Sequence, residues 1–480
     1  MTDADGASAV QRSRVDERRE WIGTALFFAA MTALCGIVFA PAISNPFFID
    51  DFGYLGVTLE DRWWTSGLLR DFSAQVLRPV TVIAIGVQQE LFGFDPIPYH
   101  VIALGLLAVQ GVLLFLVARR LGVGLFGSRA AAAVLMLHTT NGWSIAWTAS
   151  TSSYYAIVLG LGVVLLTCGP TISRRQMVGA VVLLAVGLLA REISIVVPFI
   201  VVAVRWMLAE GAWTVRARSA LRQARPLLVL LGAFLAARVA ASLYAQSQPE
   251  EDRLIPILNL TSFSDALPMV PDHVWSILLL ATSPVQSVIG DAGFTFPMVV
   301  VVVGALIWAA IVGLVVHETR RERTVPLLGL VWFLIAVVPP IFLQPEITYG
   351  NYADMAVPGL ALAIGAGAGA LAATWPVSLR WIVAVVGIAV LAVVGYHGGN
   401  TLFRPPPPPV VRAVELVDWA RREYPDPPPG STITVTDPLP EDPLWTSNGD
   451  LFRVMYQDPT LQVVFGDAGS GAEGSVGPTG

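Results

Sequence analysis

The chain has 480 residues, of which 55% are hydrophobic and only 13% charged, with a formal net charge of −6 at pH 7. Charged residues are too few to cover the surface of a soluble globule of this size. The composition therefore excludes an ordinary soluble protein and indicates a polytopic membrane protein. The two cysteines, Cys35 and Cys168, lie in separate apolar segments, which argues against a disulfide framework or a thiolate metal site.

Apolar segments near the length of a membrane crossing predict about eleven transmembrane helices. The first covers residues 21–40 and follows an arginine-rich leader, residues 1–20. No small-residue cleavage site follows it, so we expect a retained span rather than a signal peptide. The remaining predicted spans cover residues 101–118, 130–147, 154–168, 177–190, 193–208, 227–244, 298–316, 325–343, 355–373 and 381–394.

The placement of arginine tests these spans independently, because cytoplasmic loops of membrane proteins are enriched in positive charge. With a cytoplasmic N-terminus, alternate connections carry the arginine clusters and the others lack them. We therefore expect a multi-pass protein of the cell membrane with a cytoplasmic N-terminus and an extracytoplasmic C-terminus. The clusters are Arg119 and Arg120, Arg174 and Arg175, then Arg216, Arg218, Arg222 and Arg225, then Arg320, Arg321 and Arg323, and finally Arg380.

Residues 41–100 form a long predicted outer loop that mixes tryptophan, arginine and apolar segments. Such a pattern is typical of interfacial helices that lie on the membrane. The apolar segment 79–92 is an alternative span, but a crossing there would reverse every later loop and place the arginine clusters outside. We therefore expect 79–92 to be interfacial, and residues 21–400 as a whole to form the transmembrane domain.

A small extracytoplasmic domain is predicted over residues 401–465. It begins with a stiff polyproline spacer, continues with a helix over 411–424 and includes a short strand that starts at Ser431. The domain is therefore expected to be α/β. Residues 466–480 are rich in glycine and serine, which predicts a disordered tail.

Three polar clusters fall on the predicted outer side of the membrane. Charged residues between apolar segments are costly unless they are paired or face a cavity, so these clusters are candidates for function. They are Asp50 and Asp51 in FFIDDFGYL, Arg191 and Glu192 in LAREISIVVP, and Glu346, Tyr349, Asn351, Tyr352 and Asp354 around ITYGNYADM.

The motifs around these clusters resemble those of the GT-C superfamily of membrane glycosyltransferases. FFIDDFGYL, LRPV from Leu77 and FGFDPIPYH from Phe92 are similar to the first outer loop and following span of bacterial relatives of protein O-mannosyltransferases and TPR-linked O-mannosyltransferases. LAREISIVVP and ITYGNYADMAVPGLALAIG resemble later outer turns of the same proteins. The resemblance implies an all-α GT-C-like bundle and a mannosyltransferase-like enzyme of the cell envelope.

That likeness implies transfer of a hexosyl or pentosyl group from a polyprenyl phosphate to a glycan, lipid or protein acceptor. A base must take the acceptor proton. Asp50 or Asp51 is the expected base, and the other would orient the acceptor or bind a divalent cation; no other cofactor is expected. Membrane lipids are the remaining partners. No phosphate-cradling glycine-rich loop supports nucleotide-sugar chemistry, and no nucleic-acid partner is expected.

Cationic groups must also stabilise the departing phosphate. Arg78 and Arg191 are the expected guanidinium groups, because a planar fork suits phosphate oxygens. Glu192 is then expected to hold Arg191 in place, and His100 to bond to the phosphate or to the acidic pair. Tyr349 and Tyr352 are expected as supporting residues.

Simpler interpretations remain open for each residue. The aspartates could cap a helix, and Arg191 and Glu192 could cap two spans. Arg78 could extend to lipid headgroups, while His100 and the tyrosines fit an interfacial belt. At the level of function, a transporter or flippase of lipid-linked sugars and a non-catalytic scaffold are the alternatives.

Overall fold

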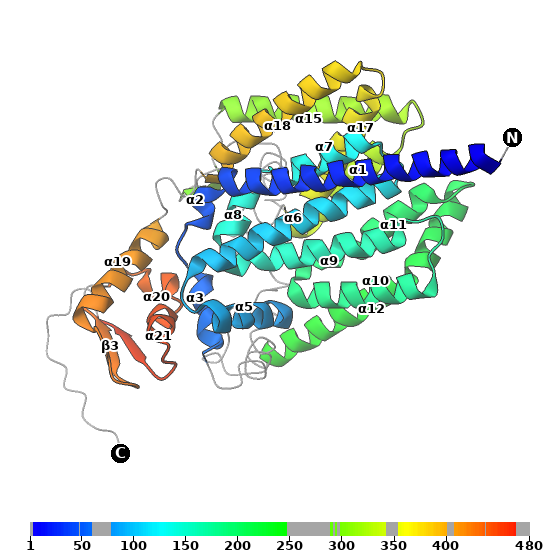
Figure 1. Cartoon of the computed structure of the whole chain (residues 1–480). Helices are drawn as coiled ribbons and strands as arrows, with labels where there is room; N and C mark the ends of the chain where they lie inside the picture. Colours follow the sequence, from blue (N-terminus) through cyan, green and yellow to red (C-terminus); the bar gives the residue numbers. More distant parts are fainter. Residues whose placement is uncertain are drawn as a thin grey trace.

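The computed structural model describes residues 3–47, 49–59, 78–246, 289–290, 293–294, 298–341, 354–400, 408–436 and 438–466. Helices dominate it, and most of them lie roughly side by side in one bundle (Figure 1). Strands contribute little: β1 (Ile289–Gly290) pairs antiparallel with β2 (Gly293–Phe294) as a two-residue ribbon.

The helices of the membrane domain, residues 3–400, are α1 (Asp3–Val38), α2 (Ala40–Ile43), α3 (Asp50–Val57), α5 (Pro79–Phe92), α6 (Pro96–Arg120), α7 (Leu125–Met136), α8 (Asn141–Ala146), η1 (Thr148–Ser150), α9 (Thr151–Thr167), α10 (Arg174–Ala190), η2 (Glu192–Val196), α11 (Val197–Leu208), α12 (Trp213–Gln246), α15 (Met298–Thr319), α16 (Val325–Ile341), α17 (Val357–Ala372) and α18 (Val377–Asn400), where η denotes a 3₁₀ helix.

Within the described residues, five helical segments are long and apolar enough to cross a membrane. The predicted polytopic all-α class is therefore confirmed, whereas the number of about eleven spans stays a prediction. Shorter apolar helices fill much of the remaining bundle, namely Pro79–Phe92, Leu125–Met136, Gly304–Thr319, Val325–Pro339 and Val357–Ala372. The five long segments are Arg18–Val38, Pro96–Arg120, Thr148–Thr167, Trp213–Ala241 and Val377–Asn400.

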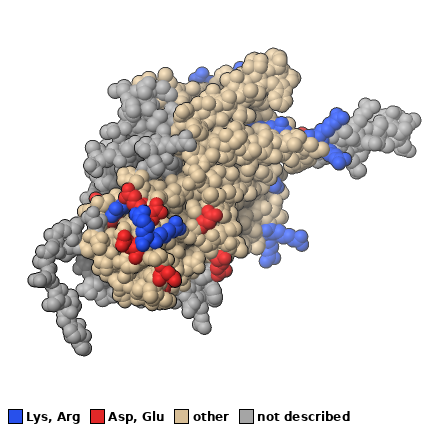
Figure 2. Space-filling view, turned by 60° about the vertical axis from the view of Figure 1, so that its left-hand side comes forward, with Lys and Arg blue, Asp and Glu red and all other residues tan. Residues whose placement is uncertain are grey.

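Different elements lie at the two ends of the bundle. The end that holds the N-terminus also holds the connections from α9 to α10 and from α11 to α12, whereas α3 and α5 lie at the opposite end, here called the α3 end (Figure 1). In the face shown by Figure 2, charged side chains gather near the two ends and the broad surface between them is largely uncharged. This distribution is the one expected of a bundle whose middle is in lipid.

Small residues let helices in the bundle approach closely. A Cβ added to Gly365 of α17 would lie 2.5 Å from the Cβ of Ala131 in α7, and one added to Gly359 would lie 2.6 Å from the backbone nitrogen of Phe333 in α16. Neither distance leaves room for a side chain, so both glycines are required by close packing. Such contacts between small residues are a usual basis of helix association in membranes.

The predicted span 130–147 is wrong as a single helix. The structure ends α7 at Met136 and starts the short helix α8 at Asn141. The Asn141 side-chain amide donates to the carbonyl oxygens of Leu135 and Met136, at 2.8 and 3.2 Å. It therefore satisfies carbonyl groups that the end of α7 leaves open, and the break is stable inside the protein.

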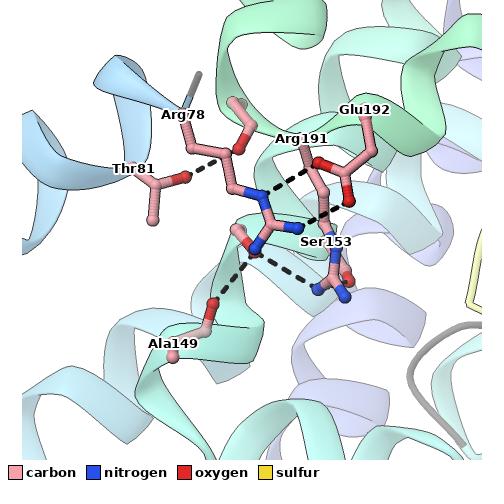
Figure 3. A network of polar contacts seen from close by, with 8 residues as sticks. Arg78, Thr81, Ala149, Ser153, Arg191 and Glu192 are labelled. Carbon is pink, nitrogen blue, oxygen red and sulfur yellow. Dashed lines mark hydrogen bonds and ion pairs between the residues drawn. The ribbon is translucent and has the colours of Figure 1, made fainter. Parts of the chain in front are cut away.

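The segment 79–92 forms α5, which contacts α3 and α10. Pro79 stands at its first position, where the missing N–H has no helical partner to lose. Thr81 of α5 donates its hydroxyl to the carbonyl oxygen of Ala190 at 2.8 Å, which fixes α5 to the end of α10 (Figure 3). The interfacial location predicted for this helix remains a prediction.

The C-terminal unit, residues 408–436 and 438–466, comprises α19 (Pro408–Glu423), β3 (Thr432–Val435), α20 (Asp442–Trp445), α21 (Asp450–Tyr456) and β4 (Gln462–Phe465). The two strands pair in parallel, with Thr432 opposite Gln462 and Val435 opposite Phe465. The unit stands at the α3 end of the bundle (Figure 1).

A hydrophobic core joins the C-terminal unit to the first loop of the membrane domain. Phe52 and Leu55 of α3 are buried in the same cluster as Leu416, Ile433 and Phe452 of the C-terminal unit. Burial of such side chains contributes roughly 1.5–3 kcal/mol each. The helix that carries the acidic pair is therefore packed against the end of the chain.

Candidate active site

The two aspartates of the acidic pair lie in different environments. Asp51 is fully buried, and its Oδ1 accepts a hydrogen bond from the backbone N–H of Ala149 in η1 at 2.7 Å. Asp50, at the first position of α3, is exposed. The N-cap of α3 is Ile49, and no side chain caps this helix end. The capping interpretation of the pair is therefore wrong, although negative charge in a first turn does suit the helix dipole.

Arg78 and Glu192 form a two-point ion pair between separate parts of the fold. Nε of Arg78 donates to Oε2 of Glu192 at 2.9 Å, and Nη2 donates to Oε1 at 2.5 Å (Figure 3). Both side chains are only partly exposed, at 17% and 28%. Burial alone would raise the pKa of Glu192, but Arg78, and less strongly Arg191, lower it to about 2. Glu192 is therefore ionised at neutral pH, and it fixes the orientation of the Arg78 guanidinium.

Arg191 is held by serine hydroxyls. Its Nη1 donates to Oγ of Ser153 at 2.5 Å and to Oγ of Ser152 at 3.2 Å, while its backbone is extended between α10 and η2 (Figure 3). The direct hydrogen bonds of the Glu192 carboxylate go to Arg78, and Glu192 interacts with Arg191 through charge, so its predicted role in holding Arg191 stays a prediction. Arg191 is buried, with 3% of its surface exposed.

A chain of hydrogen bonds connects Asp51 to Arg191. Asp51 accepts from the N–H of Ala149, the carbonyl oxygen of Ala149 accepts from Oγ of Ser152 at 2.9 Å, and Ser152 accepts from Arg191. These bonds cross from α3 through η1 to α9 and the end of α10. The bonds of Asp51 thus fix the position of α3 relative to Arg191.

The arginines act electrostatically on the exposed aspartate. Desolvation by surrounding protein raises the pKa of Asp50 above its usual value, although Arg78 and Arg191 oppose this shift. Asp50 reaches solvent on one side and is crowded by protein on the others. A carboxylate with a raised pKa is a better proton acceptor than a fully solvated one. The arrangement therefore places an exposed carboxylate within electrostatic range of two cationic groups.

A third carboxylate belongs to the same region. Asp354 is buried immediately before α17 and accepts a hydrogen bond from the hydroxyl of Ser144 in α8. Burial raises its pKa to about 7, while the Ser144 hydrogen bond and the charge of Arg191 act in the opposite direction. Of the third predicted cluster, Asp354 thus interacts with the charge of Arg191, whereas Tyr349 and Tyr352 lie outside the described residues.

His100 does not join this group. The residue is buried in α6, and its Nδ1 lies 2.9 Å from the carbonyl oxygen of Ile43. This Nδ1 contact ties α6 to α2 and does not reach the acidic pair, whereas the expected bond of His100 to the donor phosphate stays a prediction. Across the ranges that the structure describes, no group of three or more His, Cys, Asp or Glu side chains is arranged to hold a metal ion.

Serine and threonine residues of the segment 139–153 were missed as site residues. Ser144, Ser152 and Ser153 are all buried, and each bonds to a charged group of the site. The signal for them is the dense run of hydroxyl residues in HTTNGWSIAWTASTSS, which stands between two apolar segments. Buried hydroxyls need partners, so such a run indicates a polar interior.

Comparisons with known proteins agree with this architecture. No protein-family model matches the chain, and no curated protein matches it in sequence. Among solved structures, ArnT from Cupriavidus metallidurans bound to undecaprenyl phosphate is similar, with a TM-score of 0.55 and 16% identity over 93% of this chain and 86% of that chain. The same protein in its apo state gives a TM-score of 0.52 and 16% identity over 92% and 86%. This chain therefore shares the overall fold of ArnT.

Proposed function

We propose that this protein is a membrane glycosyltransferase that moves a sugar from a polyprenyl-phosphate donor to an acceptor hydroxyl on the outer face of the cell membrane. The single observation that carries the proposal is the position of Asp50, an exposed carboxylate that feels the charges of Arg78 and Arg191. The similarity in fold to ArnT, which is described as bound to undecaprenyl phosphate, supports a lipid-phosphate donor.

Asp50 is the proposed base. The acceptor oxygen attacks the anomeric carbon of the donor sugar, Asp50 takes the acceptor proton, and the bond between the sugar and the phosphate oxygen breaks. The electron pair of that bond leaves with the polyprenyl phosphate. Because Asp50 reaches solvent whereas Asp51 is buried against Ala149, Asp50 is the member of the pair that an acceptor can meet.

Arg191 and Arg78 are the proposed phosphate ligands. Negative charge grows on the phosphate as the sugar leaves, and fixed guanidinium groups stabilise that charge without reorganising. The Ser152 and Ser153 hydroxyls hold Arg191, and Glu192 holds Arg78. The negative charge of Glu192 also compensates part of the positive charge of Arg78. We therefore assign the larger share of phosphate binding to Arg191.

The arginine pattern supports the orientation. Arg119 and Arg120 end α6, and Arg174 and Arg175 begin α10, at the bundle end remote from α3. If that end is cytoplasmic, the α3 end and the C-terminal unit face outward. The lipid donor then enters sideways from the membrane, and the acceptor arrives from outside.

A transfer assay on the purified full-length protein tests the proposal. The assay supplies undecaprenyl-phosphate hexoses and pentoses with glycan, lipid and peptide acceptors, and it measures product formation alongside donor binding. We expect transfer from at least one donor, and a loss of about 100-fold in Arg191→Gln. The exposed Arg422 at the end of α19 provides a matched control, since Arg422→Gln should behave as wild type.

Two outcomes would overturn the proposal. Donor binding without transfer to any acceptor would move the assignment to a transporter of lipid-linked sugars. Absence of both binding and transfer would indicate a non-catalytic scaffold.

A further inference from the structure

The peptide that precedes the proposed base has an unusual backbone conformation. Ile49 has φ 51° and ψ −120°, which is a left-handed φ for a β-branched residue. Such a conformation costs about 1–3 kcal/mol and persists only where the surrounding structure imposes it. Since Ile49 is the N-cap of α3, this conformation sets the direction in which α3 begins and therefore the position of Asp50.

One hydrogen bond to this strained peptide comes from the far end of the chain. Oγ of Ser447, in the C-terminal unit, donates to the carbonyl oxygen of Ile49 at 3.0 Å, across 398 positions of sequence. Ser447 also has a positive φ of 50°, and it is followed by Asn448 at 55° and Gly449 at 90°. Two unusual backbone segments therefore meet at one hydrogen bond.

The same segment packs against the face of α3 that bears two glycines. A Cβ on Gly53 would lie 3.3 Å from Oγ of Ser447, and a Cβ on Gly56 would lie 2.6 Å from Cγ of Asp450. The carboxylate of Asp450 is in turn fixed by Arg453, whose Nη1 donates to its Oδ1 at 2.7 Å. The contact between α3 and the start of α21 is therefore close and leaves no room for a larger residue at position 56.

We infer that the C-terminal unit positions the proposed base, with Ser447 as the positioning residue. This inference rests on the proposed function and extends it: the end of the chain fixes α3 so that Asp50 meets the acceptor at the correct distance from Arg78 and Arg191. Displacement of a reacting group by about 1 Å can reduce a rate by roughly 100-fold. The C-terminal unit thus acts on catalysis indirectly, through the contact of Ser447 with Ile49 and α3, and none of its residues needs to touch substrate.

The substitution Ser447→Gly separates positioning from folding. Glycine accepts a positive φ without strain, which offsets part of the cost of the lost hydrogen bond, so the variant should unfold within a few degrees of wild type. It lacks the hydroxyl that holds Ile49. We expect a decrease of about ten-fold in the single-turnover transfer rate, with donor affinity within about two-fold of wild type. Hydrogen exchange of the amides in residues 50–57 should also become faster.

Ser431 offers a matched control in the same unit. Its Oγ has no hydrogen-bond partner among the residues that the structure describes, so Ser431→Ala should change neither the transfer rate nor hydrogen exchange in α3. A second test variant is Gly56→Ala, which must displace Asp450. Its control is Gly105→Ala in α6, where a Cβ meets nothing within 4 Å.

The two readouts distinguish a failure of this inference from a failure of the proposed function. A stable Ser447→Gly protein with wild-type transfer and wild-type exchange in α3 would overturn the inference and leave the glycosyltransferase assignment intact. A wild-type protein without transfer would overturn the proposed function, and the exchange measurement would then still decide whether Ser447 holds α3.

Discussion

The guanidinium group of Arg78 and the carboxylate of Glu192 meet through two hydrogen bonds, at 2.9 and 2.5 Å, although 114 positions separate them in sequence. The pair joins the residue before α5 to the start of η2. It therefore connects the first loop of the membrane domain to the turn between α10 and α11.

This ion pair makes stability depend on acidity. Because the pKa of Glu192 is lowered to about 2, the folded protein binds its proton less readily than the unfolded chain. The stabilisation is complete above the ordinary glutamate pKa of about 4.5 and is lost progressively as the pH falls toward 2. Thermal unfolding of wild type in detergent should show a decrease in melting temperature of several degrees between pH 6 and pH 3.

The variant Glu192→Gln should be less stable than wild type at pH 6 and should lose less on acidification. Glu423→Gln, at an exposed position that ends α19, should follow the wild-type curve. If melting temperature fell equally with pH in wild type and Glu192→Gln, the loss of stability in acid could not be assigned to this ion pair.

The Ser153 hydroxyl should matter for catalysis through Arg191. A hydrogen bond to a charged group contributes roughly 1.5–3 kcal/mol, so Ser153→Ala should weaken donor binding by about ten-fold or more. Ser128 provides a control, because its hydroxyl bonds only to backbone oxygens of Val123 and Gly124 among the described contacts, at the other end of the bundle. Ser128→Ala should bind the donor as wild type does, and equal affinity in the two variants would argue against a role for Ser153.

The transfer rate should rise with pH, because Asp50 must be ionised to accept a proton and its pKa is raised. Arg191 opposes that rise in pKa, so its removal should move the midpoint of the pH profile to higher pH. Single-turnover rates at saturating donor should show this upward shift in Arg191→Gln, whereas Arg191→Lys, which keeps the charge, should retain the wild-type midpoint. An identical midpoint in wild type and Arg191→Gln would mean that the group whose ionisation controls the transfer rate is not Asp50.

Many of the helices could be predicted from the lengths of the apolar segments. The predicted spans 101–118 and 177–190 fall within α6 and α10, because each is a long uninterrupted apolar segment. The break after α7 did not follow, since the polar residues around Asn141 lie in a segment that is apolar on average, and the two bonds of Asn141 to the end of α7 depend on three-dimensional position. Hydropathy reports the average of a segment, whereas a single buried amide decides where the helix ends.

The sequence predicted which charged residues belong to the candidate site better than it predicted which of them bond to each other. Arg191 and Glu192 were expected because charges between apolar segments are costly, and Arg78 because a guanidinium group suits phosphate oxygens, but the partner of Glu192 was assigned to its sequence neighbour. Adjacent side chains in an extended backbone point in different directions, so Arg191 turns to Ser153 while Glu192 meets Arg78. Pairing across more than 100 positions depends on the packing of helices, which the local pattern does not contain.

The measurement that tests the central claim most directly compares Asp50→Asn with Asp51→Asn in single-turnover transfer by the purified protein, with donor binding measured in parallel. Asn at position 51 keeps an oxygen that can accept from the Ala149 N–H, so this variant should retain the fold and transfer within about ten-fold of wild type. Asn at position 50 cannot take a proton, so transfer should fall by about 100-fold or more while the donor still binds. Retained transfer in Asp50→Asn would contradict the account, and loss in Asp51→Asn alone would make the buried aspartate the base.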